Sequence, residues 1–123
     1  MIKGLAGATI WSEDLGRLLP FYRDTLGLEV QMEAPGFVLL GQAGAPKVAL
    51  GTHSDVHGQA KEPARHILSL DTDDIHGDYQ RLSGTGVEFL EAPTAGPGGD
   101  VAFATFKDPE GNYLQLVQFS DAR

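Results

Sequence analysis

Hydrophobic and polar residues alternate along several short stretches of the chain, and this period of two is typical of strands with one buried face. In the first half, short strands are expected at about residues 28–33, 37–42 and 46–51. In the second half, they are expected at about residues 87–91, 100–106 and 112–118. The intervening turns carry Pro35-Gly36, Gly44 and Gly111-Asn112, which suit hairpin connections.

Two other stretches have apolar residues at helical spacing, so an amphipathic helix is predicted in each half. The first helix carries one apolar stripe, made of Leu15, Leu18, Leu19, Tyr22 and Leu26. The second helix carries Ile75, Tyr79 and Leu82, with Asp73 or Asp74 as its cap.

The ends and the interior of the first helix contain residues with special backbone properties. Asp14 or Ser12 can cap its start, and Gly27 stands where a left-handed residue would end it. Pro20 lies inside the helix, where it removes a hydrogen bond and is expected to produce a kink.

The two halves of the chain repeat one another. Residues 8–30 and 68–89 each begin with an alternating strand, reach an aspartate, continue as a helix and end in a strand that starts with glycine. The order strand–helix–strand–strand–strand therefore occurs twice, which predicts an α+β fold for a single domain over residues 1–123. Its two modules are expected at about 1–53 and 64–120, with a polar linker at about 54–63. Residues 92–100 read as a glycine-rich loop that could form a lid or rim.

Composition and charge narrow the function classes. The chain has 123 residues, 41 % of them hydrophobic, and lacks an apolar run long enough to span a membrane. It contains no cysteine, which excludes disulfides and thiolate sites and agrees with a cytoplasmic location. The net charge of −8 argues against nucleic-acid binding. The same charge would attract a cationic partner, and it would equally serve solubility alone.

Three segments resemble the vicinal oxygen chelate superfamily, which includes glyoxalase I, extradiol dioxygenases, fosfomycin-resistance transferases and bleomycin-resistance proteins. They are DLGRLLPFYRDTLGLEV (14–30), DDIHGDYQRLSGTGVEF (73–89) and FKDPEGNYLQL (106–116). The resemblance implies the glyoxalase/bleomycin-resistance fold, in which two βαβββ modules each curl a mixed sheet around a cavity. It also implies a homodimer with two equivalent sites. It does not imply a single chemistry, because function depends on the residues of the cavity.

The resemblance also assigns positions to the metal ligands of the superfamily's enzymes, which are His, Glu or Gln. In the first module these positions fall at Gly7 and at Leu50 or Gly51, none of which offers a donor. In the second module they fall at Ile67 and at Gln115, where glutamate is usual. His66 is adjacent to Ile67, but a shift of one residue turns a side chain to the other face unless a bulge intervenes.

Two histidines provide the other candidate for a metal site. In HSDVH, His53 and His57 would share a face on a helix, but the polar, glycine-flanked segment favours a loop. Because a catalytic metal generally needs about three protein ligands, the sequence predicts no metal and no cofactor. His66 and Gln115 remain weak candidates for metal binding.

Strand parity predicts the residues that line the cavity instead. Gly7, whose lack of a side chain leaves room, lies on the cavity face of the first strand, and Phe103 or Phe106 joins the face in the second module, depending on register. The predicted ligand-binding residues are Thr9, Trp11, Leu50, Ser69, Asp71, Phe103, Tyr113 and Gln115. Aromatic and apolar groups with a few hydrogen-bonding groups are typical of an organic-ligand pocket.

These residues favour a metal-free protein that binds an aromatic small molecule, with a cationic one favoured by Asp71 and the acidic chain. Trp11 would stack on such a ligand, although it could instead fill a collapsed cavity or lie in a dimer interface. One alternative is a metal-dependent lyase, isomerase or dioxygenase of the glyoxalase type that uses His66, Gln115 and His53. Another is a metal-free enzyme with Asp71 as its general base.

Overall fold

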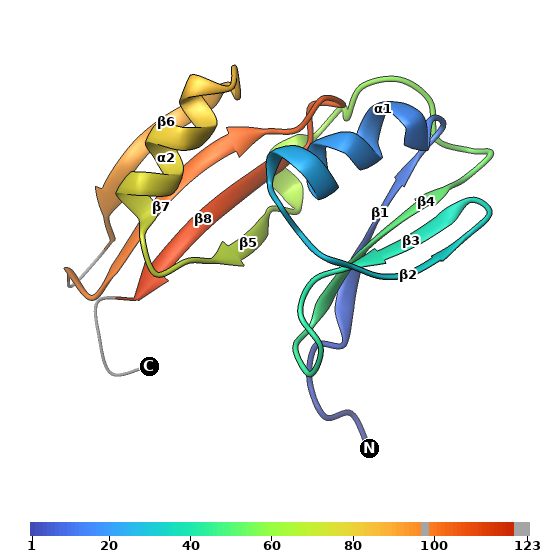
Figure 1. The fold of residues 1–123 in the computed structure, drawn as a ribbon, viewed down its shortest axis with the longest axis horizontal. Helices are drawn as coiled ribbons and strands as arrows, with labels where there is room; N and C mark the ends of the chain where they lie inside the picture. Colours follow the sequence, from blue (N-terminus) through green and yellow to red (C-terminus); the bar gives the residue numbers. More distant parts are fainter. Residues whose placement is uncertain (97–98, 120–123) are drawn as a thin grey trace. The chain divides into compact units, whose positions relative to one another are not determined.

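The computed structural model describes residues 1–96 and 99–119. The chain divides into two compact units, Met1–Gly58 and Gln59–Arg123. Each unit contains one four-stranded mixed sheet and one main helix that lies against it (Figure 1). The predicted α+β fold of two βαβββ modules is therefore confirmed.

The first unit begins with β1 (Gly7–Ser12), which leads into α1 (Leu15–Pro20) and a π-helical turn, η1 (Phe21–Thr25). The strands β2 (Val30–Ala34), β3 (Phe37–Leu40) and β4 (Lys47–Thr52) follow. They form a first sheet with the order β1-β4-β3-β2. β1 is parallel to β4, whereas the other neighbours are antiparallel.

The second unit has the same arrangement after a short 3-10 helix, η2 (Pro63–Arg65). It contains β5 (Leu68–Asp71), α2 (Ile75–Gly84), β6 (Phe89–Ala95), β7 (Val101–Lys107) and β8 (Tyr113–Phe119). They form a second sheet with the order β5-β8-β7-β6, in which β5 is parallel to β8. The repeat seen in the sequence is thus a repeat of strand order. Among the described residues, no helix has both the length and the apolar character needed to cross a bilayer.

The first helix changes its type at Pro20. Asp14 caps its start, since the Gly16 N–H donates to Asp14 Oδ1 over 3.0 Å. After Pro20 the backbone widens into the π turn η1, in which the Leu26 N–H donates to the Phe21 carbonyl over 2.9 Å. The expected disturbance at the proline therefore takes the form of this wider turn, an arrangement that π-helical segments commonly provide inside α-helices. Gly27 follows with a φ of 80°, which favours glycine.

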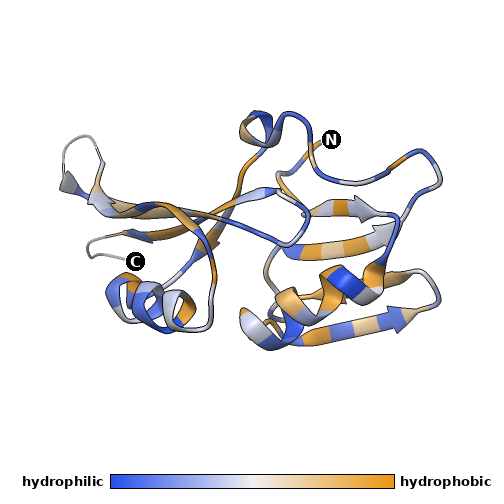
Figure 2. Cartoon of the chain, turned by 90° about the horizontal axis from the view of Figure 1, so that it is seen from above, coloured by the Kyte–Doolittle hydropathy of each residue, from blue (hydrophilic) through white to orange (hydrophobic). Residues whose placement is uncertain are grey.

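Each sheet has one face that packs against the helix of its own unit. In the first unit, Leu18 and Tyr22 are fully buried, as are Leu40 and Leu50 of the sheet. In the second unit, the core contains Ile75 and Leu82 of α2 and the sheet residues Ala104, Phe106, Leu114 and Leu116. Figure 2 shows the resulting alternation of hydrophobic and hydrophilic residues along the strands.

The segment predicted as a glycine-rich loop at 92–100 is partly a strand. β6 extends through Ala95, four residues beyond its predicted end at residue 91. The extension is possible because β6 is an edge strand with two irregularities in its register, and an edge accommodates Pro93. Residues 97–98, which belong to the predicted lid or rim, lie outside the described residues.

The DPEGN segment forms a tight turn before β8. Asp108, only 5 % exposed, accepts hydrogen bonds from the N–H groups of Glu110 and Asn112 over 2.8 and 2.9 Å. Its other oxygen accepts from Asn112 Nδ2 over 2.8 Å. Gly111 has a φ of 81°, which completes the turn. This network fixes the direction in which β8 leaves the turn.

Candidate functional site

The face of each sheet that turns away from its helix carries most of the predicted ligand-binding residues. We call these faces the open face of the first sheet and the open face of the second sheet. In the first unit, cross-strand pairing places Thr9, Ala49, Leu39, Trp11, Gly51 and Phe37 on the open face. In the second unit, pairing places Ser69, Gln115, Thr105, Asp71, Val117, Phe103, Tyr113 and Lys107 on it.

Trp11 is the largest side chain on the open face of the first sheet. It is 43 % exposed, and it pairs with Gly51 across the parallel strands β1 and β4. A Cβ atom at Gly51 would lie 2.5 Å from Trp11 Cζ3, so the six-membered ring of the indole occupies that position. The ring of His53 meets the indole nearly edge-on, with 5.5 Å between centroids and 73° between planes. Trp11 therefore rests on the sheet and keeps part of its surface free for contact.

Two expectations for the first unit need correction. Leu50 was predicted to line the ligand site, but it is fully buried in the core and pairs with Ile10 and Val38. Its neighbour Gly51 takes the open-face position, because adjacent strand residues point to opposite sides. Gly7 was expected to leave room in the cavity, but a Cβ there would collide with the Lys47 carbonyl oxygen. Gly7 instead permits the backbones of β1 and β4 to approach closely.

Gln115 lies at the centre of a polar row on the open face of the second sheet. It pairs with Ser69 on β5 and with Thr105 on β7. The Ser69 hydroxyl donates to Gln115 Oε1, and Gln115 Nε2 donates to the Thr105 hydroxyl, both over 3.5 Å. These distances exceed those of well-formed hydrogen bonds, which are about 2.7–3.2 Å. The half-buried amide is thus held loosely and can exchange either partner for a ligand.

The next row combines a carboxylate with apolar groups. Asp71 pairs with Val117, which pairs with Phe103 on β7. Phe103 occupies the open face, whereas the alternative Phe106 is fully buried in the core. Asp71 is exposed at the end of β5, so solvent reaches its carboxylate.

Tyr113 extends the open face of the second sheet to a shallow hollow. The hollow has a volume of about 460 Å³ and is lined by Glu62, Pro63, Ala64, Arg65 and Tyr113. Arg65 Nη2 lies 2.6 Å from Glu62 Oε1, so an ion pair forms part of the wall. Tyr113 and Gln115 are two residues apart on β8 and share a face, so the residue that lines the hollow lies on the same face as the polar row.

The donor set does not fit a catalytic metal. At the positions that the family pattern assigns to ligands, Gly7 and Gly51 have no side chain, and Ile67 has no donor atom. Of these positions, only Gln115 has a side-chain oxygen, and it lies on the open face of the second sheet. No group of three or more His, Cys, Asp or Glu side chains that could hold a metal ion occurs within residues 1–96 and 99–119. His66 is exposed and lies two residues before β5.

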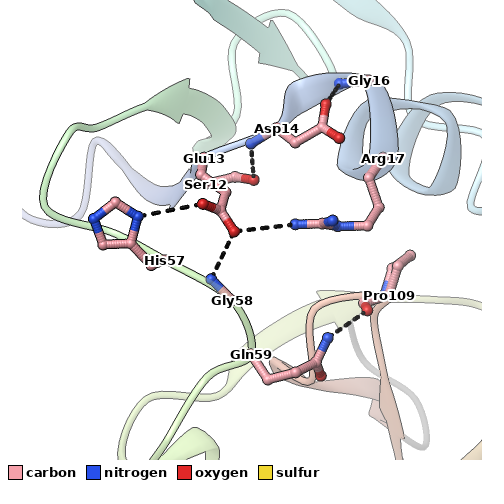
Figure 3. A network of polar contacts seen from close by, with 9 residues as sticks. All are labelled: Ser12, Glu13, Asp14, Gly16, Arg17, His57, Gly58, Gln59 and Pro109. Carbon is pink, nitrogen blue, oxygen red and sulfur yellow. Dashed lines mark hydrogen bonds and ion pairs between the residues drawn. The ribbon is translucent and has the colours of Figure 1, made fainter.

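The loop after β4 is fastened to the start of α1 by a charged network (Figure 3). Glu13 accepts from the Gly58 N–H over 2.8 Å and lies 3.2 Å from His57 Nδ1. Arg17 Nη2 lies 3.9 Å from the same carboxylate. The Gly58 hydrogen bond and the His57 contact hold the pKa of Glu13 below its ordinary value. The loop predicted for HSDVH is therefore confirmed, with His53 against Trp11 and His57 against Glu13.

The structure adds residues that the sequence pattern did not single out. Thr105 joins the polar row, and its position two residues after Phe103 on β7, which puts both on one face, was the available signal. Glu13 contacts His57 across 44 positions of sequence, and no local pattern indicates such a contact. Gly51 was considered only as a metal-ligand position, because a missing side chain gives no sign of the indole that lies on it.

Comparison with known proteins shows a family match over most of the chain. The model of the "Glyoxalase/Bleomycin resistance protein/Dioxygenase superfamily" matches residues 4–116. Two relatives from Bacillus subtilis (strain 168) are uncharacterized proteins. YetH is 28 % identical over 122 residues, covering 96 % of this chain and 100 % of its own length. YurT is 30 % identical over 122 residues, covering 89 % of this chain and 94 % of its own.

A solved structure agrees with the sequence match. It is a member of the same superfamily from Sphaerobacter thermophilus DSM 20745, with 33 % identity and a TM-score of 0.76. The likeness covers 95 % of this chain and 98 % of that one.

Proposed function

The chain belongs to the Glyoxalase/Bleomycin resistance protein/Dioxygenase superfamily, and we propose that it is a metal-free small-molecule binding protein. Its ligand would be an aromatic antibiotic or metabolite that the protein sequesters without chemical change, as in drug resistance. Affinity alone would then provide the mechanism. We further propose a homodimer, as the family resemblance implies, and a cytoplasmic location, with which the absence of cysteine agrees.

The observation that carries this proposal is the environment of Gln115. Its amide faces the open side of the second sheet, flanked by the hydroxyls of Ser69 and Thr105 at 3.5 Å. An amide both donates and accepts, so it can orient a neutral polar group of a ligand. The same amide is a weak metal ligand beside imidazole or carboxylate. The surroundings of Gln115 thus suit an organic ligand better than a metal ion.

The aromatic side chains support the same ligand class. Trp11 offers an exposed indole on one sheet, and Phe103 and Tyr113 are half-buried on the other. Stacking between aromatic rings contributes about 0.5–1.5 kcal/mol beyond area burial. The net charge of −8 and exposed Asp71 would favour a cationic ring system over an anionic one.

Two parallel measurements test the proposal. In a thermal-shift screen, a tight ligand raises the unfolding midpoint because it binds only the folded state. We expect at least one planar aromatic antibiotic to raise it, and Zn²⁺, Ni²⁺, Mn²⁺ and Fe²⁺ to leave it unchanged. Elemental analysis of protein purified without chelator should find less than stoichiometric metal. A stoichiometric metal that is lost in His66→Ala would instead establish a metal-dependent enzyme of the glyoxalase type.

A further inference from the structure

We propose that Gly51 and His53 are positioning residues that seat the Trp11 indole and fix it as a platform for a planar aromatic ligand. This inference rests on the proposed ligand-binding function. It gives Gly51 and His53 an indirect role, because they affect the ligand through the position of Trp11. The indole is the only one in the chain, which makes its fluorescence a direct report on this place.

The first part of the seat is the missing side chain of Gly51. A Cβ there would lie 2.5, 2.8 and 3.4 Å from Trp11 Cζ3, Cε3 and Cη2. Real Cβ atoms do not approach other atoms as closely as the first two distances, so any side chain would displace the ring. The atoms in conflict belong to the outer part of the indole, which can rotate more cheaply than the β1–β4 backbone can separate. A substitution at Gly51 would therefore move Trp11 and leave the sheet in place.

The second part of the seat is the ring of His53. Its backbone N–H donates to the Ser12 carbonyl over 3.1 Å, which ties the start of the loop to β1. The Asp55 N–H donates to His53 Nδ1 over 3.1 Å, and this bond orients the imidazole. The imidazole meets the indole at 73°, with centroids 5.5 Å apart. His53 thus limits the rotation of the Trp11 indole on the side where it contacts the ring.

A seated ring has a thermodynamic advantage over a mobile one. Ordering a side chain when a ligand binds reduces the affinity, so a ring that is already ordered avoids this loss. Phe37 also pairs with Gly51, from the other side of β4, and continues the apolar surface beside the indole. The seat therefore favours flat ligands that cover a broad area and gives no advantage to compact ones.

The test compares wild-type protein with Gly51→Ala, using proflavine as a planar probe and 1-aminoadamantane as a compact probe of the same charge. In Gly51→Ala, we expect acrylamide to quench Trp11 fluorescence more strongly and proflavine to bind several-fold more weakly. Affinity for 1-aminoadamantane should not change. Gly84→Ala is the matched control, because a Cβ at this α2 position meets no atom within 4 Å.

Two further variants keep the result interpretable. In a Trp11→Ala background, Gly51→Ala should have no additional effect on proflavine affinity, since the ring it displaces is absent. If Gly51→Ala does not fold, His53→Ala at the surface should still increase quenching and weaken proflavine binding in the same direction.

The outcomes separate the seat from the proposed function. If Gly51→Ala and His53→Ala leave both quenching and proflavine affinity unchanged, the positioning role of Gly51 and His53 is refuted. The proposed ligand-binding function is unaffected by that result. If proflavine binds wild-type protein and Trp11→Ala equally well, the platform is overturned in the same way. If neither proflavine nor any compound of the thermal-shift screen binds the wild-type protein, the proposed function is refuted, and so is the role of Trp11 as a platform.

Discussion

Leu50 and Gly51 are consecutive residues of β4 that face opposite sides of the first sheet. Leu50 is fully buried in the core beside α1, whereas Gly51 lies beneath the indole of Trp11. One strand thus carries a residue that stabilises the unit and, next to it, a residue that shapes the open face. The two roles can be separated by substitution.

Leu50→Ala should destabilise the protein without changing its ligand affinity. Truncating a buried leucine costs about 2–5 kcal/mol, because it removes apolar contacts and leaves a cavity. Denaturant unfolding measures this loss. Leu39→Ala, at a half-buried position on the open face, should be less destabilising. An affinity that falls in Leu50→Ala while the fold is retained would place Leu50 in the binding site after all.

Rebuilding a metal site should fail in this chain. The double variant Gly7→His with Gln115→Glu restores a histidine and a glutamate at two positions that the family pattern assigns to ligands. We expect no stoichiometric metal by elemental analysis, because a Cβ at Gly7 collides with the Lys47 carbonyl and Gly51 still offers no donor. Gln115→Glu alone is the control for folding. Stoichiometric Zn²⁺ or Ni²⁺ in the double variant would refute the donor-set argument.

Removing the amide at Gln115 should weaken ligand binding without unfolding the protein. Gln115→Leu replaces the amide with an apolar side chain that is one atom shorter and cannot hydrogen-bond, and one lost hydrogen bond costs about 1 kcal/mol, or roughly fivefold in affinity. Titration calorimetry with the best compound of the thermal-shift screen measures the change. Gln42→Leu, at an exposed position of the first unit, is the control. Equal affinities in both variants would remove Gln115 from the site.

The turn before β8 should depend on the carboxylate of Asp108. Asp108→Ala removes the acceptor of three hydrogen bonds and should lower the free energy of unfolding by about 1–3 kcal/mol, since it leaves buried donors unsatisfied. Asp108→Asn retains one acceptor oxygen and should be less harmful. Denaturant unfolding of both variants gives the comparison. Equal stability of Asp108→Ala and wild type would show that water replaces the carboxylate.

The contact of Glu13 with Gly58 and His57 should stabilise the protein at neutral pH and fail in acid. Because the pKa of Glu13 is lower in the folded state than in the unfolded state, its contribution is complete above the ordinary pKa of an unfolded glutamate. It is lost as the pH falls through the lower folded pKa. The contribution should be small, because the carboxylate is exposed.

Unfolding of wild type and Glu13→Gln between about pH 7 and pH 3 checks this dependence. The difference in stability should stay constant at higher pH and shrink below about pH 4. Glu33→Gln, at another exposed position, controls for the loss of one negative charge. A difference that persists unchanged at pH 3 would contradict a carboxylate contact.

Local rules were sufficient to predict much of the fold. The alternation along β8 correctly places Gln115 and Tyr113 on one face and Leu114 in the core. Helical spacing likewise identifies both helices, and capping chemistry narrows each cap to two residues, of which the structure selects Asp14 and Asp74. These features depend on neighbours within a few residues, which the sequence displays directly.

The parts of the site that escaped prediction depend on distant neighbours. The row of Ser69, Gln115 and Thr105 requires the register of three strands, which no single strand encodes. The role of a glycine is harder to predict, because it depends on which atoms of distant residues lie next to it. Gly7 meets the backbone of β4 and Gly51 meets an indole, yet in the sequence both appear only as missing side chains.

In each unit, the first strand is parallel to the last: Gly7 pairs with Lys47, and Leu68 pairs with Leu114. During synthesis on the ribosome, β1 must therefore wait for β4 to emerge, and β5 for β8, before either sheet can close. Pairing over such sequence separations is slow, because the closure entropy of the loop is lost before the contacts form. A ribosome pause after residue 52 has left the exit tunnel would give the first unit time to fold before the second is complete.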